Sequence, residues 1–171
     1  MKTRFRMRPF FSCAILILQS ACLHRSRGGD VQVRVRPDTV DIRRDANAVT
    51  MKLSSVIRNS AAHELFYQPC GAYLQRLVEE AWATVWTPIC VGAGTPTRIA
   101  PHDSATVDLE ILAFFSRNSG GAVRLPVVDP RMTPGRYRVV VPVGRTAASS
   151  GIGIDQQLPL AQRASEPFEV R

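Results

Sequence analysis

The fold of this chain is decided by the stretch Met132-Thr133-Pro134-Gly135-Arg136-Tyr137-Arg138-Val139. Pro134-Gly135 predicts a tight turn, because proline presets one turn dihedral and glycine adopts conformations that other residues avoid. Tyr137 then opens a strand in which Val139 and Val141 point to the same side. The strand signal is strongest over residues 138–143, which are mostly valine. We therefore expect a tight turn that leads into one buried strand.

Most of the remaining sequence also alternates apolar and polar residues with a period of two, which is typical of strands. Residues 72–86 carry apolar side chains at helical spacing as well, but the preceding Gly71 and the β-favouring residues at their end favour a hairpin with Glu79-Glu80 at its tip. Seven or eight short strands predict an all-β fold, an antiparallel β-sandwich. The candidate strands lie at 31–36, 49–57, 65–67, 73–78, 82–90, 106–115, 138–143 and 168–170.

The N-terminal segment has the order of features found in a secretory signal. Basic residues precede an apolar run at 10–18, and the small residues Ser20-Ala21 follow it. The run is too short to cross a bilayer as a helix, which takes roughly 20 apolar residues. We therefore expect residues 1–21 to be a signal peptide, 22–30 a flexible tether and 31–171 a single domain.

Cys22, directly after Ser20-Ala21, resembles the lipid-attachment cysteine of bacterial lipoproteins. The resemblance implies that Cys22 carries the lipid and becomes the mature N-terminus. The protein would then be exported to the periplasm or cell surface and anchored to a membrane. Gln19 stands where the lipoprotein pattern has an apolar residue such as leucine. The alternative is an ordinary signal cleavage near Ala21, which would release a soluble secreted domain.

The charge pattern bears on the class of partner. The whole chain has a formal net charge of +8, and the four basic residues of the signal segment account for half of it. The remaining basic residues are scattered as far as Arg171, with no clustered run of basic and aromatic residues. For an exported chain, this pattern predicts that nucleic acid is not a partner.

Two cysteines remain after processing, Cys70 and Cys90. In an oxidising compartment the even count predicts a disulfide, and closing a loop of about 20 residues stabilises a fold by roughly 3 kcal/mol. A metal site is disfavoured because no histidine or further cysteine lies at ligand spacing, and His24, His63 and His102 form no such pair. A redox role is disfavoured because the chain has no Cys-x-x-Cys. We expect a structural disulfide, no metal and no cofactor.

The segment around Tyr137 resembles the tyrosine corner of immunoglobulin-like domains, with Gly135 two residues before the tyrosine. The chain also resembles, over residues 45–171, the bacterial immunoglobulin-like domains of exported lipoproteins. This resemblance implies an immunoglobulin-like (fibronectin III-like) sandwich that serves as an envelope module, and it implies no activity. The motifs that carry it are Val49-Thr50-Met51-Lys52-Leu53, Asn59-Ser60, Tyr67 with Cys70-Gly71, Trp82 and Trp86, Pro101-His102-Asp103-Ser104, residues 134–138 and Pro167-Phe168-Glu169-Val170.

Candidate binding residues leave two alternatives open. The aromatic residues Phe66, Tyr67, Trp82 and Trp86 either form an exposed binding face or fill the core between the sheets. The segment 144–158 is rich in glycine, serine and alanine, and it is either a recognition loop or a disordered insertion.

Catalytic patterns are weak, since the chain has no Gly-x-Ser-x-Gly elbow and no complete dinucleotide fingerprint. We therefore expect a non-enzymatic, lipid-anchored envelope protein that acts as an interaction or accessory module for an unidentified envelope protein. The alternative is a protease-inhibitor-like sandwich that presents Pro88-Ile89-Cys90 or the segment 144–158 to a protease. A hydrolase would need polar residues that converge in a pocket.

Overall fold

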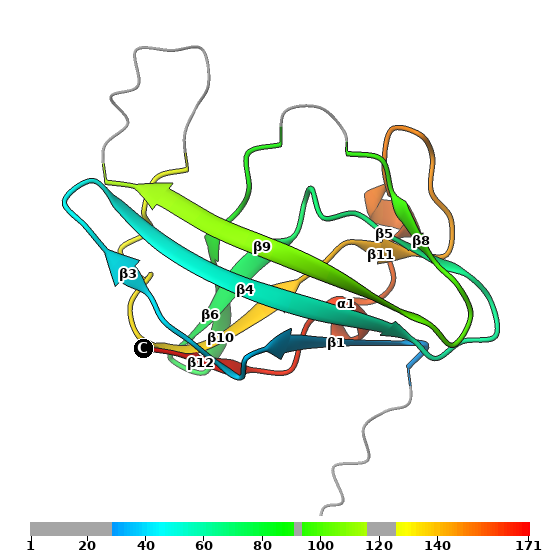
Figure 1. Ribbon diagram of the computed structural model, residues 1–171, viewed down its shortest axis with the longest axis horizontal. Coiled ribbons are helices and arrows are strands. Elements are labelled where there is room, and N and C mark those ends of the chain that lie inside the picture. The colour runs from blue at the N-terminus through cyan, green and yellow to red at the C-terminus, as the bar shows by residue number, and fades with distance from the viewer. Residues whose placement is uncertain (1–28, 91–93, 116–125) are drawn as a thin grey trace, which may run out of the picture.

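The computed structural model describes residues 29–90, 94–115 and 126–171 (Figure 1). The predicted signal peptide and Cys22 with most of the tether lie outside the described residues. The sequence Asn118-Ser119-Gly120-Gly121, whose composition is typical of a turn, lies outside them as well. Strands make up most of the described chain, so the prediction of an all-β fold is confirmed.

The first sheet is built around β4 (Ala48–Asn59). β1 (Val31–Arg36) pairs antiparallel with one edge of β4, and β9 (Ser104–Phe114) pairs antiparallel with the other. The two-residue β3 (Arg43–Arg44) pairs with the start of β4 on the same edge as β1. Each long strand alternates buried and exposed residues, so one face of the sheet is apolar.

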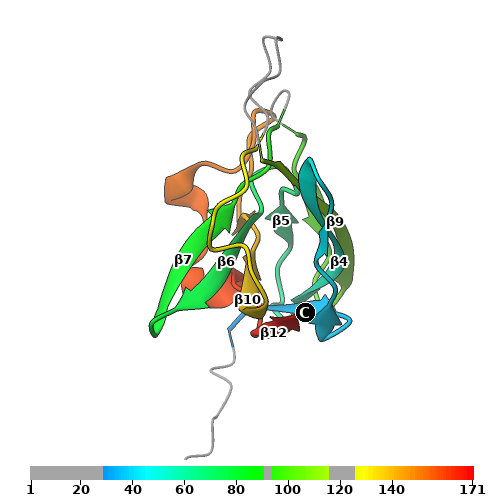
Figure 2. The same ribbon diagram turned by 90° about the vertical axis from the view of Figure 1, so that its left-hand side faces the viewer.

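The second sheet has the order β2 (Thr39–Val40), β12 (Phe168–Val170), β10 (Gly135–Val140), β6 (Tyr73–Val78) and β7 (Ala81–Trp86). β2 runs parallel to β12, and the other neighbours are antiparallel. Figure 2 shows this sheet facing the first one, so the domain consists of two layers.

The core lies between the two layers and is filled by the inward residues of both sheets. Met51, Ile57 and Ile111 from the first sheet and Leu74 and Val139 from the second are each at most 1% exposed. Burying a side chain of this size contributes about 1.5–3 kcal/mol, so these alternating positions supply most of the stability.

A small third sheet closes one end of the sandwich, in the order β11 (Val143–Gly144), β5 (Leu65–Tyr67) and β8 (Thr97–Ile99). After β11 the chain forms a 3-10 turn, η1 (Ile154–Gln156), and a one-turn helix, α1 (Leu160–Arg163), before it returns as β12. These elements are too short to produce a periodic signal, and the sequence did not predict η1, α1, β2, β3 or β8.

The single strand expected over residues 138–143 is wrong, because Pro142 divides it. β10 ends at Val140 within the second sheet, and β11 belongs to the third sheet. Pro142 has no N–H with which to continue a ladder, and its carbonyl accepts a hydrogen bond from the Gln68 N–H at 3.0 Å. The strand therefore changes partners at this residue.

The hairpin expected over residues 72–86 is confirmed. β6 and β7 are antiparallel neighbours, and Glu79-Glu80 forms the exposed tip between them. Both tip residues have positive φ angles, 46° and 68°, as a two-residue turn requires if its twist is to match that of the strands.

The turn before β10 is held by a buried tyrosine. The ring of Tyr137 is fully buried, and its hydroxyl donates a hydrogen bond to the Thr133 carbonyl at 2.5 Å. Burial raises the pKa of this phenol. Gly135 has a φ of +146°, and a Cβ there would also lie 3.2 Å from the Arg76 guanidinium, so the turn requires glycine.

Two arginines donate hydrogen bonds to the backbone carbonyls of the residues before and after Thr133. Arg44, from β3 in the first sheet, donates to the Met132 carbonyl, and Arg76, from β6 in the second sheet, donates to the Pro134 carbonyl at 3.0 Å. Three successive carbonyls of this turn therefore each have a side-chain donor, and the donors come from both layers.

Tyr137→Phe tests the contribution of this hydroxyl. The substitution keeps the ring but leaves the Thr133 carbonyl without its donor, so we expect the free energy of unfolding to fall by about 1–2 kcal/mol. Urea denaturation with an unchanged slope would measure the loss. Tyr73→Phe, on the outer face of the second sheet, is the matched control and should change stability by less than about 0.5 kcal/mol. Equal effects of the two substitutions would contradict the assignment.

Candidate functional site

Segments far apart in the sequence meet at one end of the sandwich. β5, β8 and β11 come from three different connections of the chain, and the third sheet joins them. Figure 1 shows them together at the end of the molecule opposite the C-terminus. We call this region, residues 60–72, 87–90, 94–103 and 143–158, the loop end.

Asn59, at the end of β4, connects the strand to two of these segments. Its side chain is fully buried, and its amide nitrogen donates to the carbonyls of His63 at 2.9 Å, Ile99 at 3.3 Å and Ala100 at 3.0 Å. Its side-chain oxygen accepts from the Ala61 N–H at 2.9 Å. The hydrogen-bonding capacity of one buried amide thereby fixes the path of two loops.

Gln68 connects the remaining segment. Its amide nitrogen donates to the Gly94 carbonyl at 3.1 Å, and its oxygen accepts from the Ile152 N–H at 3.0 Å. Gly151 has a φ of +125°, and a Cβ there would lie 2.8 Å from the Gln68 side chain. The segment 144–158 is thus packed against the sandwich through Gln68, and it is not the disordered insertion that its composition also allowed.

The predicted disulfide is present. Cys70 and Cys90 are bonded, with 5.7 Å between their Cα atoms and a sequence separation of 20 residues. The bond ties the segment after β5 to the segment after β7, so it is part of the loop end.

Neither of the described histidines, His63 and His102, belongs to a group that could hold a metal ion. His63 lies 3.9 Å from the Asp30 carboxylate, and His102 lies in the turn before β9. Asp108, which the sequence places near His102, is bonded to Ser54 on β4 instead. His24 lies outside the described residues, and within the described ranges no group of three His, Cys, Asp or Glu residues could hold a metal ion.

The loop end exposes two large apolar side chains and pairs most of its charges. Ile154 on η1 is 90% exposed, and Ile89 beside the disulfide is 42% exposed. Isolated surface isoleucines are common, but a side chain as exposed as Ile154 is available for contact with a partner. The ion pairs here are Arg98–Glu64 at 3.1 Å and Arg145–Asp30 at 2.8 Å.

The four aromatic residues do not form one surface. Trp86 and Tyr67 are each 8% exposed and belong to the core, and the Trp86 indole N–H donates to the Leu112 carbonyl at 3.1 Å. Phe66 is half-buried on β5. Only Trp82 lies on the outer face of the second sheet, where the Arg138 guanidinium sits 4.4 Å from its ring centroid. The core alternative is therefore correct for Trp86 and Tyr67, and Trp82 is the aromatic residue of a surface.

Arg138 is held in place on that outer face. Its Nε donates to the Gln75 side-chain oxygen at 2.8 Å, and the Gln75 amide nitrogen donates to the Thr84 hydroxyl at 3.3 Å. Burial lowers the pKa of Arg138, and Tyr73 nearby partly offsets this effect. The guanidinium is thus partly desolvated, stacked on Trp82 and fixed at one edge.

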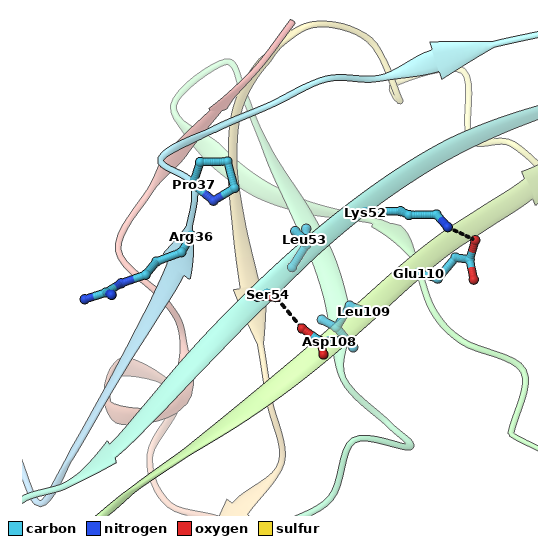
Figure 3. Close-up of a pocket in the computed structure, with 8 residues that line it drawn as sticks. All are labelled: Arg36, Pro37, Lys52, Leu53, Ser54, Asp108, Leu109 and Glu110. Carbon is cyan, nitrogen blue, oxygen red and sulfur yellow. Dashed lines mark hydrogen bonds and ion pairs between the residues drawn. The ribbon is translucent and has the colours of Figure 1, made fainter.

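A shallow groove of about 540 Å³ lies on the outer side of the first sheet (Figure 3). The charges across its floor are paired between strands: Lys52 contacts Glu110 at 3.1 Å, and the Ser54 hydroxyl bonds to Asp108. Such cross-strand pairs stabilise an exposed sheet face. We therefore interpret the groove as a solvated surface and not as a binding site. Its lining residues are Arg36, Pro37, Lys52, Leu53, Ser54, Asp108, Leu109 and Glu110.

Within the described residues, no helix has the length and apolar character needed to cross a membrane.

No model of a known protein family matches the chain, and no curated protein matches it. Among solved structures, it is similar to the Pseudomonas fluorescens alkylpurine DNA glycosylase AlkC bound to DNA containing an abasic site analog, with 13% sequence identity and a TM-score of 0.35. The match covers 84% of this chain and 31% of the glycosylase chain, so this chain spans less than a third of that protein. A likeness at this TM-score carries no argument about function.

The prediction that nucleic acid is excluded as a partner is corrected by this finding. The matched structure is a DNA complex, so the exclusion is withdrawn, but a likeness this weak does not assign DNA binding to this chain. The physical reason is that the fold gathers basic residues that the sequence scatters. Arg34 and Arg36 on β1 and Lys52 and Arg58 on β4 are all exposed, and the antiparallel register places them on one face. Asp108 and Glu110 on β9 share this face, and Lys52 is paired with Glu110 and Arg34 with Glu166.

Gln68→Ala tests how the loop end is held. The substitution leaves the Gly94 carbonyl and the Ile152 N–H without partners, so we expect a loss of about 1–3 kcal/mol in the free energy of unfolding. Hydrogen exchange at the Ile152 amide should accelerate, because its acceptor is lost. Gln157→Ala, in the same segment, is the control. Unchanged exchange at Ile152 would show that Gln68 does not hold this segment.

Proposed function

We propose that this chain is a non-enzymatic, lipid-anchored cell-envelope protein whose single immunoglobulin-like domain serves as an interaction or accessory module. The two-layered arrangement of β1-β4-β9 against β2-β12-β10-β6-β7 supports an immunoglobulin-like sandwich. The Tyr137 hydroxyl bond to the backbone four residues upstream also supports it, because immunoglobulin-like domains have a tyrosine corner at this place.

The observation that carries the proposed interaction role is the construction of the loop end. Immunoglobulin-like domains bind partners through loops that a rigid sandwich gathers at one end. Here a small sheet, a disulfide and two buried amides, Asn59 and Gln68, hold such loops in place. A surface fixed in this way loses little conformational entropy on binding, which favours affinity.

The tether joins the domain at this same end. The Ser60 N–H donates to the Asp30 carbonyl at 2.8 Å, and the Asp30 carboxylate contacts Arg145 at 2.8 Å. Nine extended residues from Cys22 to Asp30 would span at most about 30 Å. A lipid on Cys22 would therefore keep the loop end close to the bilayer, and we infer a partner at the membrane surface.

The Cys22→Ala substitution tests the anchor. Expressed in a bacterial host, the unsubstituted chain should have an intact mass that includes lipid and should fractionate with membranes. The Cys22→Ala chain should lose the added mass and become soluble, because the thiol that forms the thioether is gone. An unmodified, soluble product of the unsubstituted chain, cut near Ala21, would contradict the proposal.

A protease inhibitor is the second candidate, and one observation favours it. Pro88, Ile89 and Cys90 lie outside any strand, Ile89 is 42% exposed, and the disulfide fixes the end of the segment. An exposed segment that is rigid before binding is what a protease cleft captures tightly.

Inhibition of a panel of serine and cysteine proteases by the Cys22→Ala chain tests this candidate. Inhibition that Ile89→Asp weakens at least about tenfold, by placing a charge in an apolar subsite, would support it. Lys52→Ala, on the outer side of the first sheet, is the control and should inhibit as the parent does. No inhibition by the parent chain would remove the candidate.

A further inference from the structure

The outer face of β10, β6 and β7 carries a cation for which the described residues supply no counter-ion. Arg138 lies opposite Gln75, and Gln75 lies opposite Thr84, so their side chains share the face that points away from the core. Across residues 29–90, 94–115 and 126–171, no carboxylate lies within 4.0 Å of the Arg138 guanidinium. Partly buried charges are normally paired, so an unpaired one requires an explanation.

The guanidinium is also oriented. The Trp82 ring supports its plane at 4.4 Å, and the bond from Nε to Gln75 fixes one edge. This leaves the terminal nitrogens as donors on the remaining edge. A planar cation with donors in a fixed fork matches the two oxygens of a carboxylate.

The surrounding surface has the composition of a contact site. Tyr73, Leu77 and Trp82 are half-buried on the same face, with Arg138 among them. Tryptophan, tyrosine and arginine are enriched among the residues that contribute most to protein–protein binding. Figure 2 shows the orange turn η1 projecting on this side of the molecule.

We propose that this face, built on Tyr73, Leu77, Trp82 and Arg138, docks an acidic segment of a partner protein and that Arg138 receives an aspartate or glutamate carboxylate from it. The stacked arginine supplies the charge complementarity, and the half-buried apolar residues around it supply the contact area. The occupant is a protein segment, because tryptophan, tyrosine and arginine together are typical of protein–protein contacts. The proposal goes beyond the envelope module and does not depend on the lipid anchor.

Selection from a phage-displayed random peptide library tests the proposal, with the full chain carrying Cys22→Ala as bait. The selected peptides should be enriched in Asp or Glu next to an apolar residue. Binding of these peptides should fall at least about tenfold in Arg138→Gln, because a charge-assisted hydrogen bond is lost. Arg138→Lys should recover only part of the affinity, since lysine keeps the charge but not the planar fork. Affinity should also fall as salt is raised.

Arg136→Gln is the matched control. Arg136 lies two residues before Arg138 on the same face, but it already contacts Glu169 at 3.6 Å, so its loss should leave peptide affinity unchanged. Thermal unfolding of each variant shows whether the domain is intact. Trp82→Leu is a second test. It removes the ring on which Arg138 stacks and keeps the arginine, so peptide affinity should fall.

Acidic peptides whose affinity depends on Arg138 and Trp82, and is unchanged in Arg136→Gln, would support the proposal. Peptides without acidic residues, peptides whose binding survives Arg138→Gln in a folded chain, or no selected peptide at all would overturn it. Apolar peptides that bind equally to Arg138→Gln would point to an apolar partner or a second copy of the chain.

Discussion

The structure depends most on the turn that carries the chain from the first sheet to the second, before β10. Its three successive carbonyls, at residues 132–134, accept hydrogen bonds from Arg44, Tyr137 and Arg76. Arg44 belongs to the first sheet, whereas Tyr137 and Arg76 belong to the second. The turn therefore fixes the position of one layer relative to the other. Close packing of the alternating apolar residues requires a matched spacing between the layers, because the interior tolerates few voids.

Buried amides play the same role at the loop end. Asn59 uses nearly all its hydrogen-bonding capacity on backbone groups of the loops, and Gln68 uses one donor and one acceptor on two other segments. A buried polar group of this kind is costly when it is unsatisfied, so each amide admits one arrangement of its loops and penalises the others. This selects one shape for the surface that we assign to binding. The disulfide adds to it by restricting the unfolded chain.

Much of the fold could be read from the sequence, because strands with one buried face alternate strictly. The long strands β1, β4 and β9 and the β6–β7 hairpin were found in this way, and the cysteine count indicated the disulfide. The polar residues that organise the loop end could not be found. A single Asn or Gln near the end of a strand is most often solvated. Nothing local indicates that segments 26 to 84 residues away will bury it. The change of sheet at Pro142 was missed for a related reason, since a valine-rich run does not indicate where its partner changes.

On the second sheet, a β-bulge in β7 determines which tryptophan lies on the candidate surface. Trp82 and Trp86 are four residues apart, so a regular strand would place both on the same side. The register between β6 and β7 shifts at Leu74/Gln75, where Gln75 pairs with Thr84 but Leu74 pairs with Trp86. Val85 is therefore the extra residue of a bulge, and bulges turn later side chains to the opposite face. Trp86 consequently enters the core, whereas Trp82, before the bulge, stays outside, where Arg138 stacks on it. A regular β7 would have left both tryptophans on one face, so the bulge is what leaves Trp82 as the tryptophan of this surface, beside Tyr73.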